Sequence, residues 1–159
     1  MTLQDHLYSD ALLKFAAGLQ KKTVLSDPDF TATADSPLCG SRIRVDINYQ
    51  RDQQIVTAYG HDVRACALGQ ASAAILQQHI IGQSKTSITA AYQQLLMILK
   101  ESDSDLHHHT DPHPNPDSMD LWKDLALFRP VAAHRSRHAS VLLPFKAVLK
   151  AIDQSENDT

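Results

Sequence analysis

The strongest constraint on the fold is the strict alternation of apolar and polar side chains in RIRVDINY, residues 42–49. Alternate side chains of an extended strand point to opposite faces, so this pattern predicts a strand with one buried face. A polar turn at Asp52 follows, and QIVTAYG, residues 54–60, predicts the antiparallel partner of a hairpin. A sheet of this kind needs a layer of other elements over its apolar face.

The other apolar patterns are mostly helical and can supply that layer. A short edge strand is expected around residues 30–33, in an irregular stretch rich in proline and polar residues. Apolar residues recur at helical spacing in residues 3–19, 66–82, 84–99, 119–128 and 141–152, the last of which Pro144 must bend or begin. We therefore expect an α+β fold in which a small three-stranded antiparallel sheet carries helices packed on one face.

Length and composition predict a single domain over residues 1–159. Residues 101–117, rich in His, Asp and Pro, are expected to form a mobile loop, and residues 153–159 a flexible tail. The net charge of −3 argues against nucleic acid and membrane surfaces as partners. Two cysteines are too few for a disulfide framework, so the reducing cytoplasm is the expected location.

Each cysteine adjoins one strand of the predicted hairpin. Cys39 lies on a turn made by Pro37 and Gly40, just before the first strand, and Cys66 follows the second strand at the start of a helix. Because a hairpin returns the chain to its starting end, we expect both thiols at the same end of the sheet. The helix N-terminus favours the thiolate of Cys66, the form that binds metal or attacks sulfur. The alternative is that both cysteines are small buried apolar residues.

A metal site needs a third ligand, for which histidine is the candidate. The chain has nine histidines, more than packing requires, and thiolate with imidazole suits zinc or iron. His61 closes the second strand, and His138 opens the last helix, where the helix dipole keeps the imidazole neutral. The other candidates are His134 and, in the predicted loop, His107, His108, His109 and His113.

Three segments carry a family resemblance. SPLCGSRIRVDI resembles the motif P-x-C-G-D-x-[IV], and GHDVRACALGQASAAIL resembles G-x-G-C-x-[IL]-S-x-A-S-A. RSRHASV resembles a third motif, in which a basic residue precedes a cysteine, and Tyr8 fits an opening LY. Over about residues 5–152 the sequence thus resembles the NifU/IscU/SufU-type iron–sulfur cluster scaffold family. The resemblance implies the SufE/NifU-like fold.

The resemblance also implies a site for an iron–sulfur cluster or zinc. It maps two cysteines of the family onto Cys39 and Cys66, and it puts His138 in place of the third, so these three residues would hold the metal or the cluster. The aspartate that the family has after its first cysteine is Ser41 here. The fourth position stays open to water, sulfide, His61, Asp62 or a cysteine of a partner protein.

Three functions follow from this site. The leading interpretation is a scaffold, not an enzyme, that assembles a transient cluster on Cys39, Cys66 and His138 and passes it to recipient apoproteins. A cysteine desulfurase would be its partner. The alternative is a zinc-dependent sulfurtransferase in which Cys39 or Cys66 accepts persulfide sulfur from the desulfurase. The third interpretation is a non-catalytic adaptor stabilised by metal.

Overall fold

A three-stranded antiparallel sheet forms one side of the molecule. The structure, a computed structural model, describes residues 9–100 and 121–157. The strands pair in the order β1-β2-β3 and are β1 (Phe30–Ser36), β2 (Ser41–Gln50) and β3 (Ile55–Arg64). Ile43, Val45 and Ile47 of β2 are at most 1% exposed, as expected for the buried face of an alternating strand. The predicted hairpin is confirmed, and the edge strand is longer than expected.

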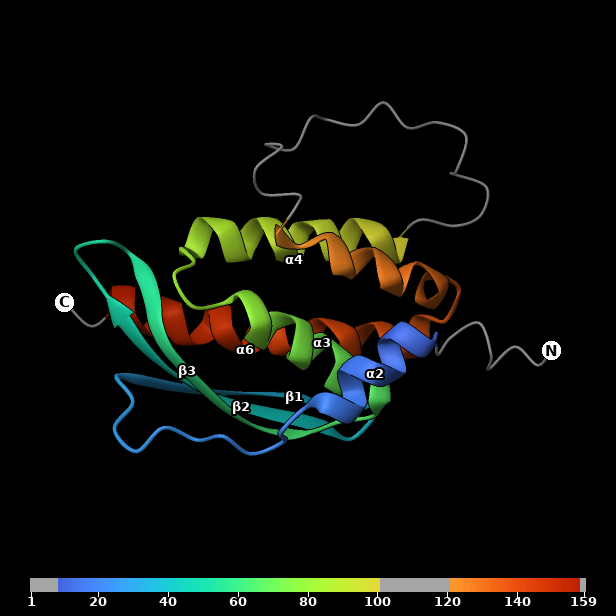
Figure 1. Cartoon of the computed structure of the whole chain (residues 1–159), viewed down its shortest axis with the longest axis horizontal. Helices are drawn as coiled ribbons and strands as arrows, with labels where there is room; N and C mark the ends of the chain where they lie inside the picture. The colour runs from blue at the N-terminus through green and yellow to red at the C-terminus, as the bar shows by residue number, and fades with distance from the viewer. Residues whose placement is uncertain (1–8, 101–120, 158–159) are drawn as a thin grey trace, which may run out of the picture.

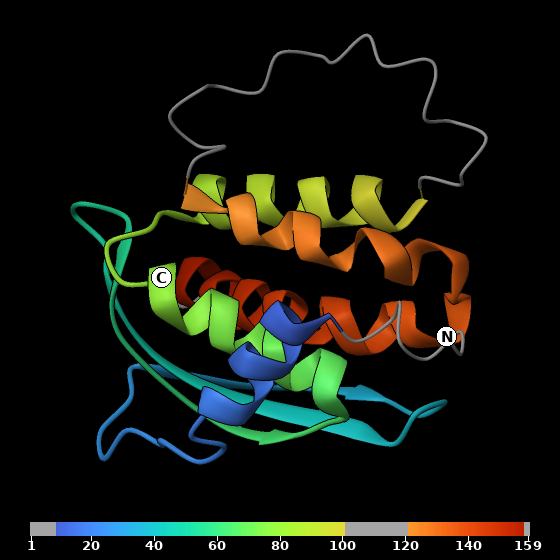
Figure 2. The same ribbon diagram turned by 45° about the vertical axis from the view of Figure 1, so that its right-hand side comes forward.

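Helices cover the apolar face of this sheet in two layers (Figure 1, Figure 2). The described helices are α2 (Asp10–Gly18), α3 (Ala67–His79), α4 (Lys85–Lys100), η2 (Lys123–Ala133), η3 (Arg135–Arg137) and α6 (His138–Asn157). In the inner layer, α6 packs on β1 and β2, and α3 packs between α6 and α2. In the outer layer, α4 and η2 pack against each other, and α4 also contacts α6. The expected α+β fold with helices on one face is confirmed.

Aromatic side chains fill the space between the two helical layers. Trp122 is 1% exposed, and its ring meets that of Phe145 edge to face, with 5.8 Å between centroids. The ring of His79 also meets the indole edge to face, with 5.6 Å between centroids. Such pairs add to the burial of apolar area and fix how the outer layer sits on α6.

Polar side chains set the starts of the helices. The hydroxyl of Ser9 accepts a hydrogen bond from the backbone N–H of Leu12 at 3.2 Å and caps α2. The hydroxyl of Ser84 accepts from the N–H of Ser87 at 3.2 Å and caps α4. In the segment expected to be helical at residues 119–128, the structure has the 3-10 helix η2 from Lys123.

The last helix is longer than the sequence suggested. α6 includes Pro144 in its interior and continues to Asn157, through most of the expected tail. Lys85 of α4 explains the extension, because its ammonium group binds the carboxylates of Asp153 at 2.8 Å and Glu156 at 2.7 Å. The expected loop at residues 101–117 lies outside the described residues. No helix in the described part of the chain combines the length and apolarity needed to cross a bilayer.

Candidate functional site

The first thiol lies on the turn that joins β1 to β2. Cys39 is exposed. The turn is closed by a hydrogen bond of 2.9 Å from the N–H of Gly40 to the carbonyl oxygen of Ser36. Gly40 has a φ of 69°, a left-handed conformation that a residue with a Cβ rarely adopts. The turn therefore holds the thiol outside the core at one end of the sheet.

The second thiol lies at the same end. Arg42 pairs with Arg64, so the start of β2 lies beside the end of β3, and Cys66 follows directly. Cys66 is the N-cap residue of α3, yet its side chain makes no capping hydrogen bond. Its sulfur is therefore available to other groups. The expectation that the hairpin brings both thiols to one end of the sheet is confirmed.

Two serine hydroxyls connect the thiols. The Sγ of Cys66 lies 3.2 Å from the Oγ of Ser140. The Oγ of Ser140 lies 3.4 Å from that of Ser41, and the thiol of Cys39 donates to the Oγ of Ser41 at 3.2 Å. Ser140 and Ser41 are 0% and 4% exposed, so their hydroxyls depend on these neighbours for hydrogen bonds. We call these four residues the thiol–hydroxyl chain.

The surroundings of Cys39 favour its thiolate. Burial is the largest single influence and would raise the pKa of Cys39. Hydrogen bonds from the side chains of Ser36 and Ser41, and from the backbone at Ser41 and Cys39 itself, act in the opposite direction. Together they outweigh burial and lower the pKa of Cys39 below its ordinary value. An exposed thiol of lowered pKa is more reactive at neutral pH.

Close packing of α3 on α6 brings Ser140 to Cys66. A Cβ on Gly69 of α3 would lie only 2.7 Å from the Oγ of Ser140, so a larger residue there would push the helices apart. The hydroxyl of Ser72 donates to the carbonyl oxygen of Val141 at 2.6 Å and joins the same two helices. The small residues after Cys66 therefore position the thiol–hydroxyl chain as well as the core.

His138, the predicted third ligand, begins α6 and is hydrogen-bonded to η2. Its Nε2 lies 3.0 Å from the carbonyl oxygen of Val131 and 3.1 Å from that of Ala132. Carbonyl oxygens only accept, so Nε2 carries a proton in these contacts. The two hydrogen bonds hold the ring of His138 against η2, and they would have to break before the ring could reach the thiols.

Both ring nitrogens of His61 form hydrogen bonds within the core. It is 0% exposed, its Nε2 donates to the carbonyl oxygen of Gln20 at 2.8 Å, and its Nδ1 accepts from the hydroxyl of Tyr59 at 2.9 Å. Burial is the main cause that lowers the pKa of His61, which keeps the ring neutral. Because both ring nitrogens are used, His61 is a core residue here and not a ligand near the thiols.

The remaining candidates lie apart from the thiols or outside the described residues. Asp62 lines a hollow with three arginines on the face of the sheet away from the helices. His134 lies between η2 and η3. The cluster His107, His108, His109 and His113 falls in the part of the chain that the structure does not describe.

Within residues 9–100 and 121–157, no three His, Cys, Asp or Glu side chains lie together in a way that would hold a metal ion. The three-ligand site of Cys39, Cys66 and His138 therefore stays a prediction. The group that contacts Cys66 is Ser140, which the sequence analysis missed. A signal was present, since Ser140 lies in the third motif, two residues after His138.

Comparison with known proteins identifies the family. No protein-family model and no curated protein matches the sequence. A solved NifU-like protein (N-terminal) from Brucella abortus, described as nitrogen-fixing, matches with a TM-score of 0.83 and 34% identity over 99% of this chain and 100% of its own. A putative iron–sulfur cluster assembly scaffold protein for the SUF system from the thermophile Fervidobacterium islandicum has a TM-score of 0.72. Its 17% identity, over 92% of this chain and 96% of its own, shows the fold alone.

The similarity to the Brucella structure includes the elements that carry the candidate site. The sheet that carries both thiols, the helix that starts after Cys66 and the helix that starts at His138 all fall within the share of the chain matched to the Brucella structure. This confirms the resemblance noted in the three motifs. With about a third of its residues identical over nearly its whole length, the chain belongs to the NifU-like family.

Proposed function

We propose that the chain is an iron–sulfur cluster assembly scaffold, which holds iron and sulfide at Cys39, Cys66 and His138 and passes the cluster to recipient apoproteins. The observation that supports this most is the thiol–hydroxyl chain, in which an exposed thiol of lowered pKa is linked to a second thiol. Iron–sulfur clusters are bound chiefly by thiolates, which supply the negative charge that iron requires. The cluster is cargo in this scheme.

The serine hydroxyls stabilise the two thiols before iron arrives. A hydroxyl donates a hydrogen bond to a thiolate and accepts one from a thiol, so Ser41 and Ser140 can hydrogen-bond to a cysteine sulfur in either of its protonation states. Iron would replace their contacts with sulfur, and the hydroxyls would then bond to each other or to water. Because the turn that carries Cys39 is exposed, cargo bound there can leave without unfolding of the core.

His138 is the third ligand in this proposal. Its Nε2 is hydrogen-bonded to two carbonyl oxygens of η2, and the ring would leave these bonds and turn toward the thiols when it binds the cargo. Imidazole in place of a third thiolate lowers the negative charge of the site. A binding shell with only three protein ligands leaves the remaining coordination to small ligands or to a partner protein.

The test is cluster assembly without oxygen from iron and sulfide on the untagged chain. The measurements are iron, acid-labile sulfide and the visible absorption spectrum. We expect a coloured cluster on the parent and its loss in Cys66→Ala and His138→Ala. His134→Ala is the matched control, since it removes a nearby histidine that carries no role in the proposal. Equal assembly by parent and Cys66→Ala would overturn the proposed function. Equal assembly by parent and His138→Ala would show only that His138 is not the third ligand.

A second candidate function is favoured by the exposure and lowered pKa of Cys39. In this case zinc organises the site, and the thiolate of Cys39 or Cys66 accepts persulfide sulfur from a cysteine desulfurase. Protein that holds one zinc per chain, takes up labelled sulfur and stays colourless with iron would favour the carrier over the scaffold. Protein whose stability depends on metal, with neither cluster nor sulfur transfer, would favour an adaptor.

A further inference from the structure

Gly69 is a buried glycine in the first turn of α3. Glycine is less favourable than alanine inside a helix, so its presence there needs a reason. Backbone conformation is not that reason, because among the glycines of the described residues only Gly40 and Gly82 have a positive φ. The position therefore requires the absence of a side chain.

A side chain at this position would meet two groups that flank Cys66. A Cβ on Gly69 would lie 2.7 Å from the Cβ of Ala65, the residue before Cys66. It would also lie 2.7 Å from the Oγ of Ser140, the hydroxyl that contacts the sulfur of Cys66 at 3.2 Å. Atoms in a packed core do not approach so closely, so at least one of the two groups would have to move.

The hydroxyl of Ser140 is the group that moves most easily. The Cβ of Ala65 is fixed to the backbone, whereas a serine hydroxyl rotates between staggered positions. In a helix this hydroxyl can turn to a carbonyl oxygen of the preceding turn, which would satisfy a side chain that is 0% exposed. A side chain at position 69 would therefore take the hydroxyl of Ser140 away from the sulfur of Cys66.

The sequence departs from the family motif at the same position. Gly69 stands where the motif G-x-G-C-x-[IL]-S-x-A-S-A has a serine. A serine carries a Cβ and would meet the same two atoms. In this chain the glycine leaves room for a hydroxyl that comes from α6.

We infer that Gly69 is a positioning residue of the thiol site: because it has no side chain, the hydroxyl of Ser140 stays against the sulfur of Cys66. Ser140 also contacts the hydroxyl of Ser41 at 3.4 Å, so Gly69 acts through one contact on the whole thiol–hydroxyl chain. The inference rests on the proposed function, because it concerns the same thiols that would receive iron.

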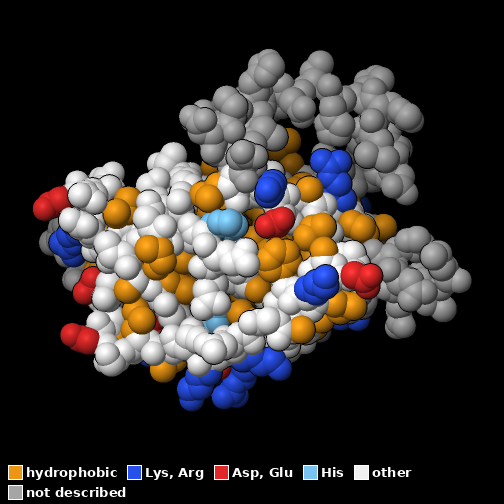
Figure 3. Space-filling model, in the orientation of Figure 1, with side chains coloured by type: hydrophobic (Ala, Val, Ile, Leu, Met, Phe, Trp, Pro, Cys, Tyr) orange, Lys and Arg blue, Asp and Glu red, His pale blue; other side chains and the backbone are white. Residues whose placement is uncertain are grey.

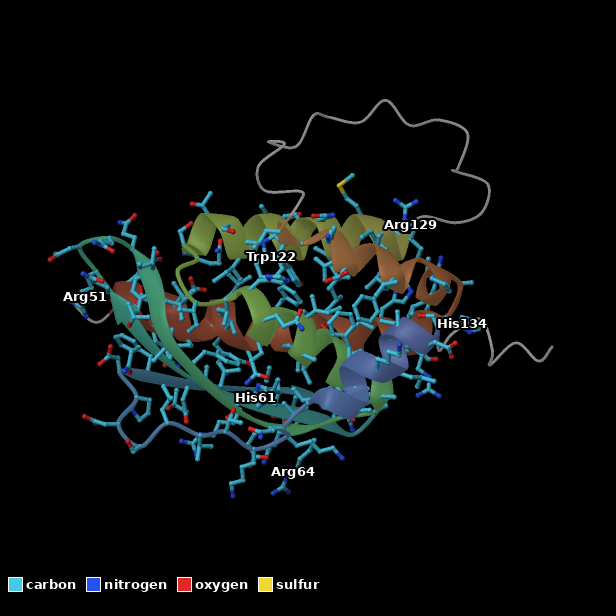
Figure 4. All side chains as sticks on the ribbon, viewed as in Figure 1. Arg51, His61, Arg64, Trp122, Arg129 and His134 are labelled. Atoms are coloured by element: carbon cyan, nitrogen blue, oxygen red, sulfur yellow. The ribbon has the colours of Figure 1, made fainter. Side chains whose placement is uncertain are left out.

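The substitutions that test this inference leave every charged group in place. Lysine and arginine side chains gather along the lower edge of the molecule, beneath the sheet (Figure 3). Arg64 points away from the helices on this side, whereas Arg129 lies on the opposite side of the molecule (Figure 4). A positive charge near a thiol changes its reactivity. Because Gly69→Ala and Ser140→Ala remove no charge, a change in the reactivity of Cys66 reports the position of the hydroxyl.

The first measurement is the alkylation rate of Cys66 in a Cys39→Ala background, for the parent, Gly69→Ala, Ser140→Ala and the variant with both changes. We expect Gly69→Ala to reproduce the fold-change of Ser140→Ala within about a factor of two, and the double variant to show no further change, since both substitutions remove the same contact. The inference would be wrong if Gly69→Ala kept the parent rate. It would also be wrong if Gly69→Ala changed the rate by the same factor whether serine or alanine stood at position 140.

The second measurement is the melting temperature. Ser140→Ala should raise the melting temperature of Gly69→Ala, although it lowers that of the parent, because it removes an atom that the added Cβ meets. Ala65→Gly is the matched comparison, since it removes the other atom. If Ala65→Gly restored the stability of Gly69→Ala and Ser140→Ala did not, Gly69 would serve the packing of Ala65 and the inference would be overturned.

Cluster assembly from iron and sulfide separates this inference from the proposed function. Gly69→Ala and Ser140→Ala should slow the appearance of the cluster's visible absorption by the same factor. Ser72→Ala is the matched control and should keep the parent rate, since Ser72 joins the same two helices without touching a thiol. A slower rate in Gly69→Ala that Ser140→Ala did not share would contradict the inference. Failure of the parent to assemble any cluster would refute the proposed function, and the alkylation rates would still decide the role of Gly69.

Discussion

Replacing Ser140 by alanine tests whether the thiol–hydroxyl chain acts on the thiols or only supports the fold. The hydroxyl of Ser140 is 0% exposed and makes contacts at 3.2 Å with the sulfur of Cys66 and at 3.4 Å with the hydroxyl of Ser41. A hydrogen bond contributes about 0.5–1.5 kcal/mol net, and a long contact or a sulfur partner lies at the weak end of that range. We expect Ser140→Ala to lower the free energy of unfolding by about 1–2 kcal/mol.

Ser72→Ala is the matched control for stability. The hydroxyl of Ser72 is also 0% exposed and joins α3 to α6, through a bond of 2.6 Å to the carbonyl oxygen of Val141, without touching a thiol. Its loss should destabilise the protein by a similar amount. Both variants are expected to lower the melting temperature by about 2–8 °C, since about 1 kcal/mol corresponds to 2–4 °C in a domain of this size.

The two variants should differ in thiol chemistry. In a Cys39→Ala background, the alkylation rate of Cys66 should change in Ser140→Ala, which loses a contact of 3.2 Å with the sulfur, and should keep the parent value in Ser72→Ala. Equal rates in both variants would refute a role of Ser140 at the thiol.

Three further predictions concern other groups of the fold. Ser41→Ala should raise the pKa of Cys39, because it removes one of the hydrogen bonds that lower it, and alkylation followed across pH will show the shift. Burial lowers the pKa of His61 below 6.5, so the neutral ring contributes stability that is complete above pH 6.5 and is lost as the pH falls through the lowered value. In urea unfolding, the free energy of unfolding of His61→Gln should therefore fall less on acidification than that of the parent. Gly69→Ala should destabilise the protein by about 1–3 kcal/mol through overpacking. Gly18→Ala, with nothing within 4 Å of the added Cβ, should not destabilise it.

The sheet could be predicted from the sequence because each strand carries its own evidence. The alternation in residues 42–49 requires one buried face, and Ile43, Val45 and Ile47 are the side chains that lie on it in the structure. The lengths of the last helix and the edge strand were less predictable, since they depend on distant partners. Residues 153–157 are polar, and within this segment Asp153 and Glu156 pair with Lys85 of another helix, while Ser155 is buried.

The site was predictable only in part for a related reason. The sequence placed Cys39 and Cys66 at one end of the sheet, because Cys39 lies just before β2 and Cys66 lies just after β3. Which side chain of α6 reaches Cys66 depends on the rotation of that helix about its axis, and the pattern of HASV does not fix it. Residues two apart on a helix point in directions about 200° apart. Since Ser140 faces α3, the side chain of His138 is directed toward η2.

This geometry bears on how the proposed third ligand would act. His138 must give up its hydrogen bonds to two carbonyl oxygens if its ring turns toward the thiols, which costs about 1–3 kcal/mol. That cost is small beside the 10–16 kcal/mol or so that binding at a structural zinc site provides. In the proposed site, metal binding would outweigh this cost, and the hydrogen bonds of His138 would form again when the metal leaves. Two thiols linked through Ser41 and Ser140, with a third ligand that bound only in the presence of cargo, would favour a site that releases what it holds.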